Sequence, residues 1–212
     1  MNEPGHGAQS TAGRLAGRLG GRTFTTLAAV LADVGRIDLA VYRAIATTPT
    51  PTLDGPLRRL SDAATKSKLW LAVAGVMAVA GGSKGRRAAV TGTAALTLNS
   101  VAVNLVGKLA FRRDRPDPTD AGVPETRHVR MPSSPSFPSG HAASGFAFAD
   151  GVAESMPILA SVLRLIAAVV AYSRVHAGVH YPGDVIVGAL IGSSIGDGVA
   201  VIDRTMQRRG SR

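Results

Sequence analysis

Three short segments of the chain gather the residue types that bind and cleave a phosphate ester. In order they are residues 108–116 (KLAFRRDRP), 138–141 (PSGH) and 173–184 (SRVHAGVHYPGD). Without a metal, such cleavage needs positive donors for the phosphate oxygens, a nucleophile, and an acid that protonates the leaving oxygen. The segments supply cations, imidazoles and a carboxylate, so they predict phosphate binding followed by attack on phosphorus.

The first and third segments contribute the cations. Lys108 and Arg115 lie seven residues apart and bracket the exit of an expected helix, which Pro116 ends. Arg174 adds a third cation, and the planar fork of a guanidinium matches the oxygens of a phosphate. These three side chains are suited to hold the group that is attacked.

The second segment opens an expected helix of small residues. Ser139 is a natural N-cap, and the N–H groups exposed at such an opening bind anions. A capping serine alone, or Gly140 alone, would predict nothing further. His141 is more informative, because in the first turn beside a cationic cluster it stands where a proton donor to the leaving group is needed.

The third segment supplies a histidine and a carboxylate four residues apart. Pro182 favours a helix start here, so Asp184 falls in the first turn and its carboxylate could reach back to His180. Such a carboxylate fixes the imidazole tautomer and leaves the other ring nitrogen free to attack phosphorus. Alternatively, Asp184 is only an acid favoured by the helix dipole. The combination with Arg174 and the other two segments favours the catalytic interpretation.

The elements that must position these segments are apolar. The chain has 212 residues, enough for one domain, with 45% apolar residues and a mean hydropathy of +0.17. Small residues in several of the apolar blocks allow close helix packing in a bilayer. We therefore expect an all-α, multi-pass membrane bundle of five apolar helices, at 69–82, 88–110, 142–153, 157–172 and 185–202. A soluble all-helical enzyme is the alternative, because several blocks are shorter than the roughly 20 residues of a span.

The two ends of the chain differ from this core. Residues 1–22 are rich in Gly, Ser, Thr and Arg and predict a mobile tail. Residues 24–46 carry four charges, which favours an N-terminal interfacial helix over a sixth span. The expected organisation is thus a tail at 1–22, a membrane domain at 23–204 and a basic tail at 205–212.

The net charge of +10 limits the partners and predicts the topology. Aromatic residues make up only 4%, which argues against nucleic acid as a partner. The basic loop 82–87 and the basic tail 204–212 lie on one side if the helices alternate, and that side should be cytoplasmic. The three segments then face outward. With no cysteine, disulfides and thiolate chemistry are excluded.

The patterns K-x6-R-P, P-S-G-H and S-R-x5-H-x3-D resemble the three signatures of the type 2 phosphatidic acid phosphatase (PAP2) superfamily. The likeness extends over about residues 36–204, with specific matching at 108–184, and the hydrophobic layout is similar to that of small bacterial membrane members. The resemblance implies a PAP2/haloperoxidase-like helical core.

The resemblance also implies roles for the matching residues. His180 would be the nucleophile that forms a phosphohistidine, Asp184 would orient it, and His141 would be the general acid. The phosphoryl oxygens would be held by Lys108, Arg115, Ser139, Gly140 and Arg174. No metal or other cofactor is expected. His176 is not a signature position, and we expect it in the wall of the site.

The function implied is that of a membrane lipid phosphatase acting on a phosphorylated lipid in the bilayer. Polyprenyl phosphates or diphosphates, phosphatidic acid, phosphatidylglycerol phosphate and a phosphorylated polyprenyl sugar remain open as substrates, as does the oligomeric state. Two alternatives are a vanadium-dependent haloperoxidase-like enzyme, whose class resembles PAP2 in the same motifs, and an inactive membrane protein of the same fold. The apolar blocks argue against the first alternative, and the intact motif residues argue against the second.

Overall fold

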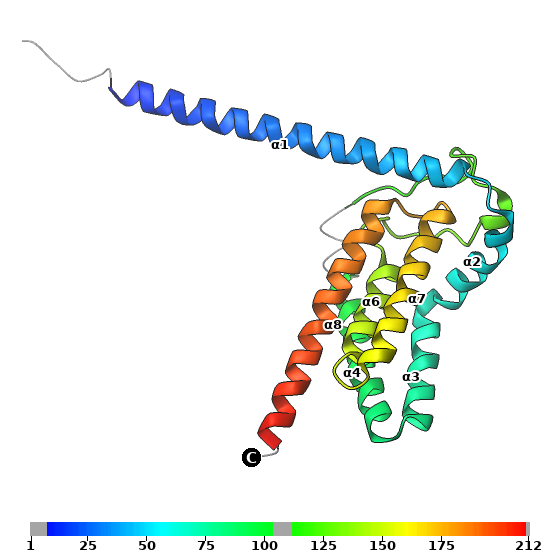
Figure 1. The fold of residues 1–212 in the computed structure, drawn as a ribbon. Coiled ribbons are helices and arrows are strands. Elements are labelled where there is room, and N and C mark those ends of the chain that lie inside the picture. Colours follow the sequence, from blue (N-terminus) through cyan, green and yellow to red (C-terminus); the bar gives the residue numbers. More distant parts are fainter. Residues whose placement is uncertain (1–7, 104–111, 211–212) are drawn as a thin grey trace, which may run out of the picture. The chain divides into compact units, whose positions relative to one another are not determined.

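A computed structural model describes residues 8–103 and 112–210 (Figure 1). These residues form helices joined by loops and turns, with no strand among them, which confirms the all-α fold class. Their contacts divide the chain into two units, residues 1–40 and 41–212. The predicted boundaries at residues 22 and 205 stay predictions.

The described residues include seven α-helices and two short 3-10 helices. Three α-helices, α2, α7 and α8, begin with a proline at the first helical position, where the missing N–H needs no partner. The elements are α1 Ala8–Thr47, α2 Pro51–Ala63, η1 Thr65–Ser67, α3 Lys68–Ala80, α4 Gly82–Val101, η3 Glu125–Arg127, α6 Gly140–Val152, α7 Pro157–His176 and α8 Pro182–Gly210.

Helix α1 contains the segment 24–46 that the sequence singles out. From Thr26 to Ile37 its residues are exposed, and Arg36 forms an ion pair with Asp33 one turn away. Over the residues described, α1 is not among the helices that meet the combined length, hydropathy and charge criteria of a membrane span. The interfacial position of this helix stays a prediction.

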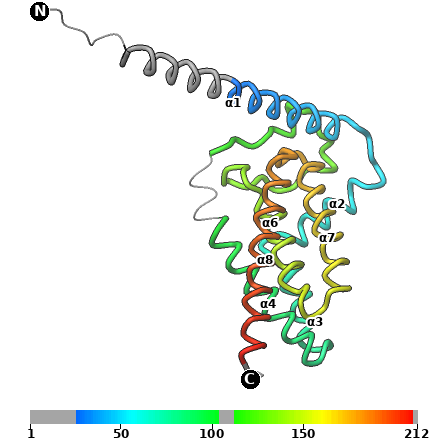
Figure 2. Tube along the Cα trace, turned by 60° about the vertical axis from the view of Figure 1, so that its left-hand side comes forward, coloured from blue at the N-terminus to red at the C-terminus, as the bar shows by residue number. Residues whose placement is uncertain are grey.

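The hydrophobic core of the second unit lies among α3, α4, α6 and α7. Trp70 of α3 is fully buried against Phe148 of α6, with ring centroids 5.7 Å apart. Most of α6 is buried, and it stands in the middle of the bundle with the other helices around it (Figures 1 and 2). Because the second segment opens α6, the most enclosed helix of the bundle fixes its position.

Three glycines on one face of α8 let this helix approach α6 closely. They are spaced four residues apart, and a Cβ atom added at any of them would collide with the backbone of α6: Gly188 with Ser139, Gly192 with Ala143 and Gly196 with Ala147. Small residues at this spacing are the usual device for close helix packing in a bilayer. The expected role of small residues is confirmed for this pair of helices.

Replacing Gly192 by alanine should therefore lower the melting temperature of the detergent-purified protein, because overpacking costs about 1–3 kcal/mol. Gly198→Ala is the matched control, since Gly198 lies in the same helix and a Cβ there meets nothing within 4 Å. Alanine favours a helix over glycine, so the control should be neutral or slightly stabilising. Equal melting temperatures for the two variants would contradict this account of the packing.

The number of membrane spans differs from the prediction. Within the described residues, only α7 and α8 are long and apolar enough to cross a membrane by themselves. The pair α2 and η1–α3 would qualify as one broken span, bent by 61°. Helices α3 and α6 have 13 residues each, short of the roughly 20 that a span needs. Five apolar spanning helices are thus not confirmed, although a helix lies in the described part of each of the five blocks.

The basic segments and the motif segments lie at opposite ends of the bundle (Figures 1 and 2). At one end, Arg87 of α4 pairs with Asp203 of α8 at 2.7 Å, and Arg204 pairs with Glu154 in the turn between α6 and α7. The loop 112–139 and the turn 177–181 lie at the other end. The fold therefore brings the chemistry-bearing residues to one end.

Candidate active site

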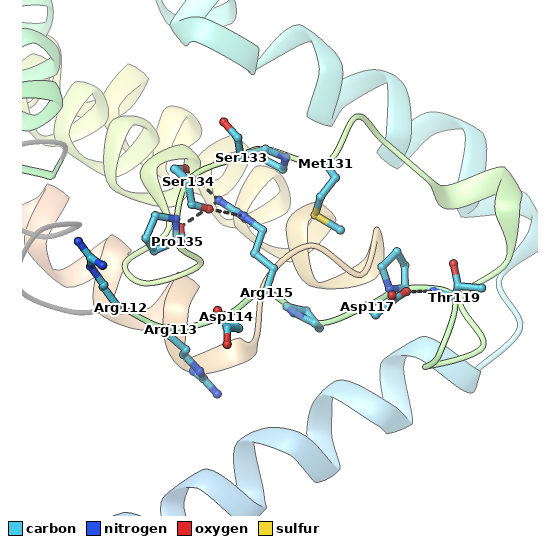
Figure 3. A pocket seen from close by; sticks show the side chains of 13 residues that line it. Arg112, Arg113, Asp114, Arg115, Asp117, Thr119, Met131, Ser133, Ser134 and Pro135 are labelled. Atoms are coloured by element: carbon cyan, nitrogen blue, oxygen red, sulfur yellow. Dashed lines mark hydrogen bonds between the residues drawn. The ribbon is translucent and has the colours of Figure 1, made fainter.

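Arg115 joins the first motif segment to the third. Its Nη1 donates to the carbonyl oxygen of Val179 at 2.8 Å and to Nε2 of His180 at 3.0 Å. The rest of the guanidinium is held by the loop that precedes α6: Nε donates to the carbonyl oxygen of Ser134 and Nη2 to that of Pro135 (Figure 3). A fixed cation thus lies directly against the expected nucleophile.

His180 is buried, and its two ring nitrogens face different groups. Nδ1 lies 3.4 Å from Oδ2 of Asp184, whereas Nε2 faces Arg115. A guanidinium can only donate hydrogen bonds, so Nε2 must carry the lone pair and Nδ1 the proton. This is the tautomer in which Nε2 can act as a nucleophile.

The protonation state of His180 also suits attack. Its pKa is lowered to about 4, first of all because the ring is buried. The hydrogen bond to Asp184 opposes this shift, and the positive charges of Arg115 and Arg174 add to it. The imidazole is therefore neutral near pH 7, as a nucleophile must be.

Asp184 is fully buried and holds three parts of the site together. Its Oδ2 accepts a hydrogen bond from the backbone N–H of Tyr181 at 2.9 Å, and its backbone carbonyl accepts one from the N–H of Ser139. The carboxylate does reach back to His180, as the four-residue spacing suggests. Asp184 is thus more than an acid at the start of a helix.

The motifs contain buried polar atoms that have no hydrogen-bond partner among the described residues. They include Oγ of Ser139, which does not cap α6, and Nε of Arg174, whose Nη1 binds Oγ of Ser61. Buried polar groups are normally satisfied, so such atoms suit a site that binds an anion. Gly140, the first residue of α6, lies next to Ser139 at the same opening.

His141 and Arg174 line one cavity of about 520 Å³. Arg115 lines a second cavity, of about 930 Å³, and residues 131–134 form a wall common to both. Arg174 also acts electrostatically on His180. Of the described motif residues, Arg115, His141 and Arg174 therefore line two adjoining cavities at one end of the bundle. Ser139, Gly140, His180 and Asp184 belong to the same end but are not part of either lining.

Two of the expected site residues, Lys108 and His176, are not among the residues that the structure brings together. Lys108 lies outside the residues that the structure describes. The sequence suggested that His176 lies in the wall of the site, but the structure places it in a buried cluster at α2. Its Nε2 lies 2.9 Å from Oγ1 of Thr50 and 3.3 Å from Asp54. Arg127 bonds the same two residues. This cluster fixes the loop before α2.

Arg113 is a contact of the site that the sequence does not single out. Its Nη1 donates to Oδ1 of Asp184 at 3.0 Å, and its guanidinium lies 3.9 Å from the centre of the Tyr181 ring. Both N–H and Oγ of Ser136 bond the carbonyl oxygen of Arg113 and so fix the path of the loop. In the sequence Arg113 is one of three arginines within four residues, with nothing to rank them.

Arg113→Gln should lower kcat by about tenfold and leave KM nearly unchanged, because a hydrogen bond to the Asp184 carboxylate is lost. Arg113→Lys, which keeps the charge, should recover part of the activity. The matched control is Arg112→Gln, since Arg112 lines the cavity of about 930 Å³ together with Arg113 but is exposed. A rise in KM with unchanged kcat would show instead that Arg113 binds substrate.

The described residues contain no group of three or more His, Asp or Glu side chains that could hold a metal ion. The donor set of the motif end is arginine, imidazole, hydroxyl and backbone N–H, which is suited to the oxygens of a phosphate. The expectation that no metal takes part stays a prediction.

Comparisons with known proteins agree with the motifs. The family model of the PAP2 superfamily matches residues 89–205. Decaprenylphosphoryl-5-phosphoribose phosphatase of Mycobacterium tuberculosis (strain H37Rv) is 33% identical over 171 residues, covering 80% of this chain and 89% of the relative. The enzyme of that name from Mycolicibacterium smegmatis is 37% identical over 150 residues, covering 71% and 78%.

Two solved structures are similar in fold. LpxE of Aquifex aeolicus has a TM-score of 0.61 and 26% identity over 76% of this chain and 93% of its own. A transmembrane PAP2-type phosphatidylglycerolphosphate phosphatase from Bacillus subtilis has a TM-score of 0.57 and 23% identity, covering 86% and 93%, and supports the fold alone. With its motifs, its helical core and these matches, the chain belongs to the PAP2 superfamily.

Proposed function

We propose that this chain hydrolyses a phosphate ester of a lipid at the outer face of the membrane, through a phosphohistidine and without a metal. The relatives of the chain are named as phosphatases, and on that ground it is a phosphoric ester hydrolase that acts on lipid phosphates. The observation that carries the mechanism is the contact chain from Arg115 to His180 to Asp184.

In the first step, Nε2 of His180 attacks phosphorus while the bond from phosphorus to the leaving oxygen breaks. Arg115 turns its donors from Nε2 to the phosphoryl oxygens, where Arg174, Ser139 and Lys108 join it. Asp184 stabilises the imidazole through the proton on Nδ1, and His141 protonates the leaving oxygen. In the second step, water attacks the phosphohistidine, His141 accepts its proton, and phosphate leaves.

For the substrate, we propose a lipid-linked phosphoryl pentose that carries a terminal phosphate. The support is the identity of 33% and 37% to two phosphatases named for decaprenylphosphoryl-5-phosphoribose. The vanadium-dependent haloperoxidase alternative gains no support from these relatives.

Phosphate release by the detergent-purified full-length protein tests this proposal. The panel holds a polyprenylphosphoryl pentose 5-phosphate, phosphatidylglycerol phosphate, phosphatidic acid and polyprenyl mono- and diphosphates, each with and without EDTA. We expect release from the pentose phosphate to be fastest and unaffected by EDTA. Loss of activity with EDTA that a divalent metal restores would contradict the mechanism, and no release from any lipid would contradict the function.

The proposed topology is multi-pass, with residues 83–87 and 204–212 in the cytoplasm and residues 112–138 outside. Its support is the separation of basic and motif segments to opposite ends of the bundle (Figure 2). In this cysteine-free chain, Thr119→Cys should react with an impermeant maleimide in intact cells, whereas Ser83→Cys should react only after lysis. Both positions are exposed, and labelling of Ser83→Cys in intact cells would reverse the topology.

A further inference from the structure

Besides His141 and Arg174, the cavity of about 520 Å³ is lined by two further cations, one carboxylate, three hydroxyl groups and three apolar residues. We propose that it receives the leaving group of the substrate and that Lys66 and Arg130 there bind a second anionic group, a phosphodiester. This proposal rests on the proposed function. It adds a binding site for a part of the substrate that does not react.

The position of His141 makes this cavity the site of the leaving group. A general acid must lie within hydrogen-bond reach of the oxygen that it protonates. The group attached to that oxygen then extends away from the phosphate into the space that His141 lines. That space also contains Arg174, which is one of the phosphate-binding cations.

The charges of the lining favour an anion. It contains three cations, Lys66, Arg130 and Arg174, against one carboxylate, Asp62. Asp62 acts electrostatically on Arg174, and the lining keeps an excess of positive charge. Lys66 and Arg130 make no ion pair with a described residue, which leaves two positive charges facing the cavity.

The backbone at Lys66 is held in a conformation that an L-residue rarely adopts. Its φ is 53°, and that of Ser67 is 59°, at the bend between α2 and α3. Neither residue is a glycine, so both positions are strained, and strain of this kind tends to gather at binding sites. The bend places Lys66 at the cavity instead of within a continuous helix.

The lining also indicates the spacer between the two phosphates. Thr65, Ser133 and Ser134 offer hydroxyl groups that can hydrogen-bond to the hydroxyls of a spacer, and Val129, Met131 and Pro132 add apolar surface to the same lining. A short hydroxylated spacer with a carbon skeleton, such as a pentose or a glycerol, can use both kinds of surface. The substrate class is therefore a lipid phosphodiester joined through such a spacer to a terminal phosphate.

The test compares lipids with one and with two phosphates. We would measure kcat/KM of the full-length protein for phosphatidylglycerol phosphate and a polyprenylphosphoryl pentose 5-phosphate, which carry the phosphodiester, and for phosphatidic acid, which does not. An aryl phosphate serves as a probe of the chemical step alone. The variants are Lys66→Gln, Arg130→Gln and the charge-preserving Lys66→Arg, with Lys68→Gln as control, because Lys68 is exposed and does not line the cavity.

We expect the wild type to prefer two-phosphate lipids and each of Lys66→Gln and Arg130→Gln to reduce that preference about tenfold, through KM. Activity on phosphatidic acid and on the aryl phosphate should not change, Lys66→Arg should restore the preference, and Lys68→Gln should leave it intact. An unaltered preference in both variants, or an equal loss on every substrate, would overturn the proposal. A wild type inactive on all three lipids would instead overturn the proposed function, and this inference with it.

Discussion

His180→Ala is expected to reduce turnover by on the order of 10⁴-fold or more, because the atom that forms the proposed phosphoenzyme is lost. In the structure, Nε2 of His180 carries the lone pair and lies against Arg115, while Nδ1 faces Asp184. Alanine removes the attacking atom itself. Steady-state phosphate release from the preferred lipid and from an aryl phosphate would measure the loss, which should be equally severe for both.

His128→Ala is the matched control for this substitution. His128 belongs to the loop between the first and second motifs and bonds the carbonyl oxygen of Val123 at 3.0 Å. Its variant should retain turnover within a few-fold of the wild type, about the loss of one neutral hydrogen bond. If His180→Ala kept activity within about tenfold of the wild type, His180 could not be the nucleophile.

The second large effect should come from His141→Ala, and it should depend on the leaving group. A lipid alkoxide leaves poorly without a proton, so its release should slow by roughly two to four orders of magnitude. An aryl group leaves without needing that proton, so its release in a single turnover should slow much less. His141 lines the cavity next to Arg174, where such a leaving oxygen would lie.

Rates for the two substrates with the same variant supply the internal control. The ratio of lipid to aryl leaving-group release in a single turnover should fall in His141→Ala and stay constant in Arg113→Gln, which acts through Asp184. An equal loss for both substrates would mean that His141 binds or positions the phosphate and is not the acid for the leaving group.

The contacts between motif residues could largely be anticipated from spacing. A histidine four residues before an aspartate, with a proline that starts a helix between them, predicts the approach of His180 to Asp184. The structure shows this contact at 3.4 Å. The contact of Arg115 with His180 joins residues 65 positions apart. Only the resemblance of their two motifs to the family signatures suggested that these residues meet.

Arg113 and His176 show where local sequence reasoning fails. Which arginine of residues 112–115 reaches Asp184 depends on the path of the loop, which Ser136 fixes from more than 20 residues away. His176 and His180 look alike in sequence, but His176 is still part of α7, where it contacts Thr50 and Asp54. Both outcomes depend on tertiary contacts that no local pattern records.

The helices were more predictable than the spans. Apolar blocks marked where the helices lie, but composition does not reveal where a helix breaks. The apolar block at 69–82 does not continue backwards into α2, because Lys66 and Ser67 of η1 adopt positive φ and α3 begins anew at Lys68. This break, together with the short α6, is why an apolar block here is not always a membrane span.

Trapping the phosphoenzyme tests the central claim most directly. The full-length protein would react briefly with its preferred lipid phosphate and with an aryl phosphate, be quenched in alkali to preserve phosphohistidine, and be analysed by peptide mass spectrometry. His141→Ala should accumulate the intermediate from the aryl phosphate, since the base for its hydrolysis is missing. The account predicts phosphate on His180 and none in His180→Ala. Phosphate on another residue, or full turnover with no phosphohistidine at any time point, would contradict it.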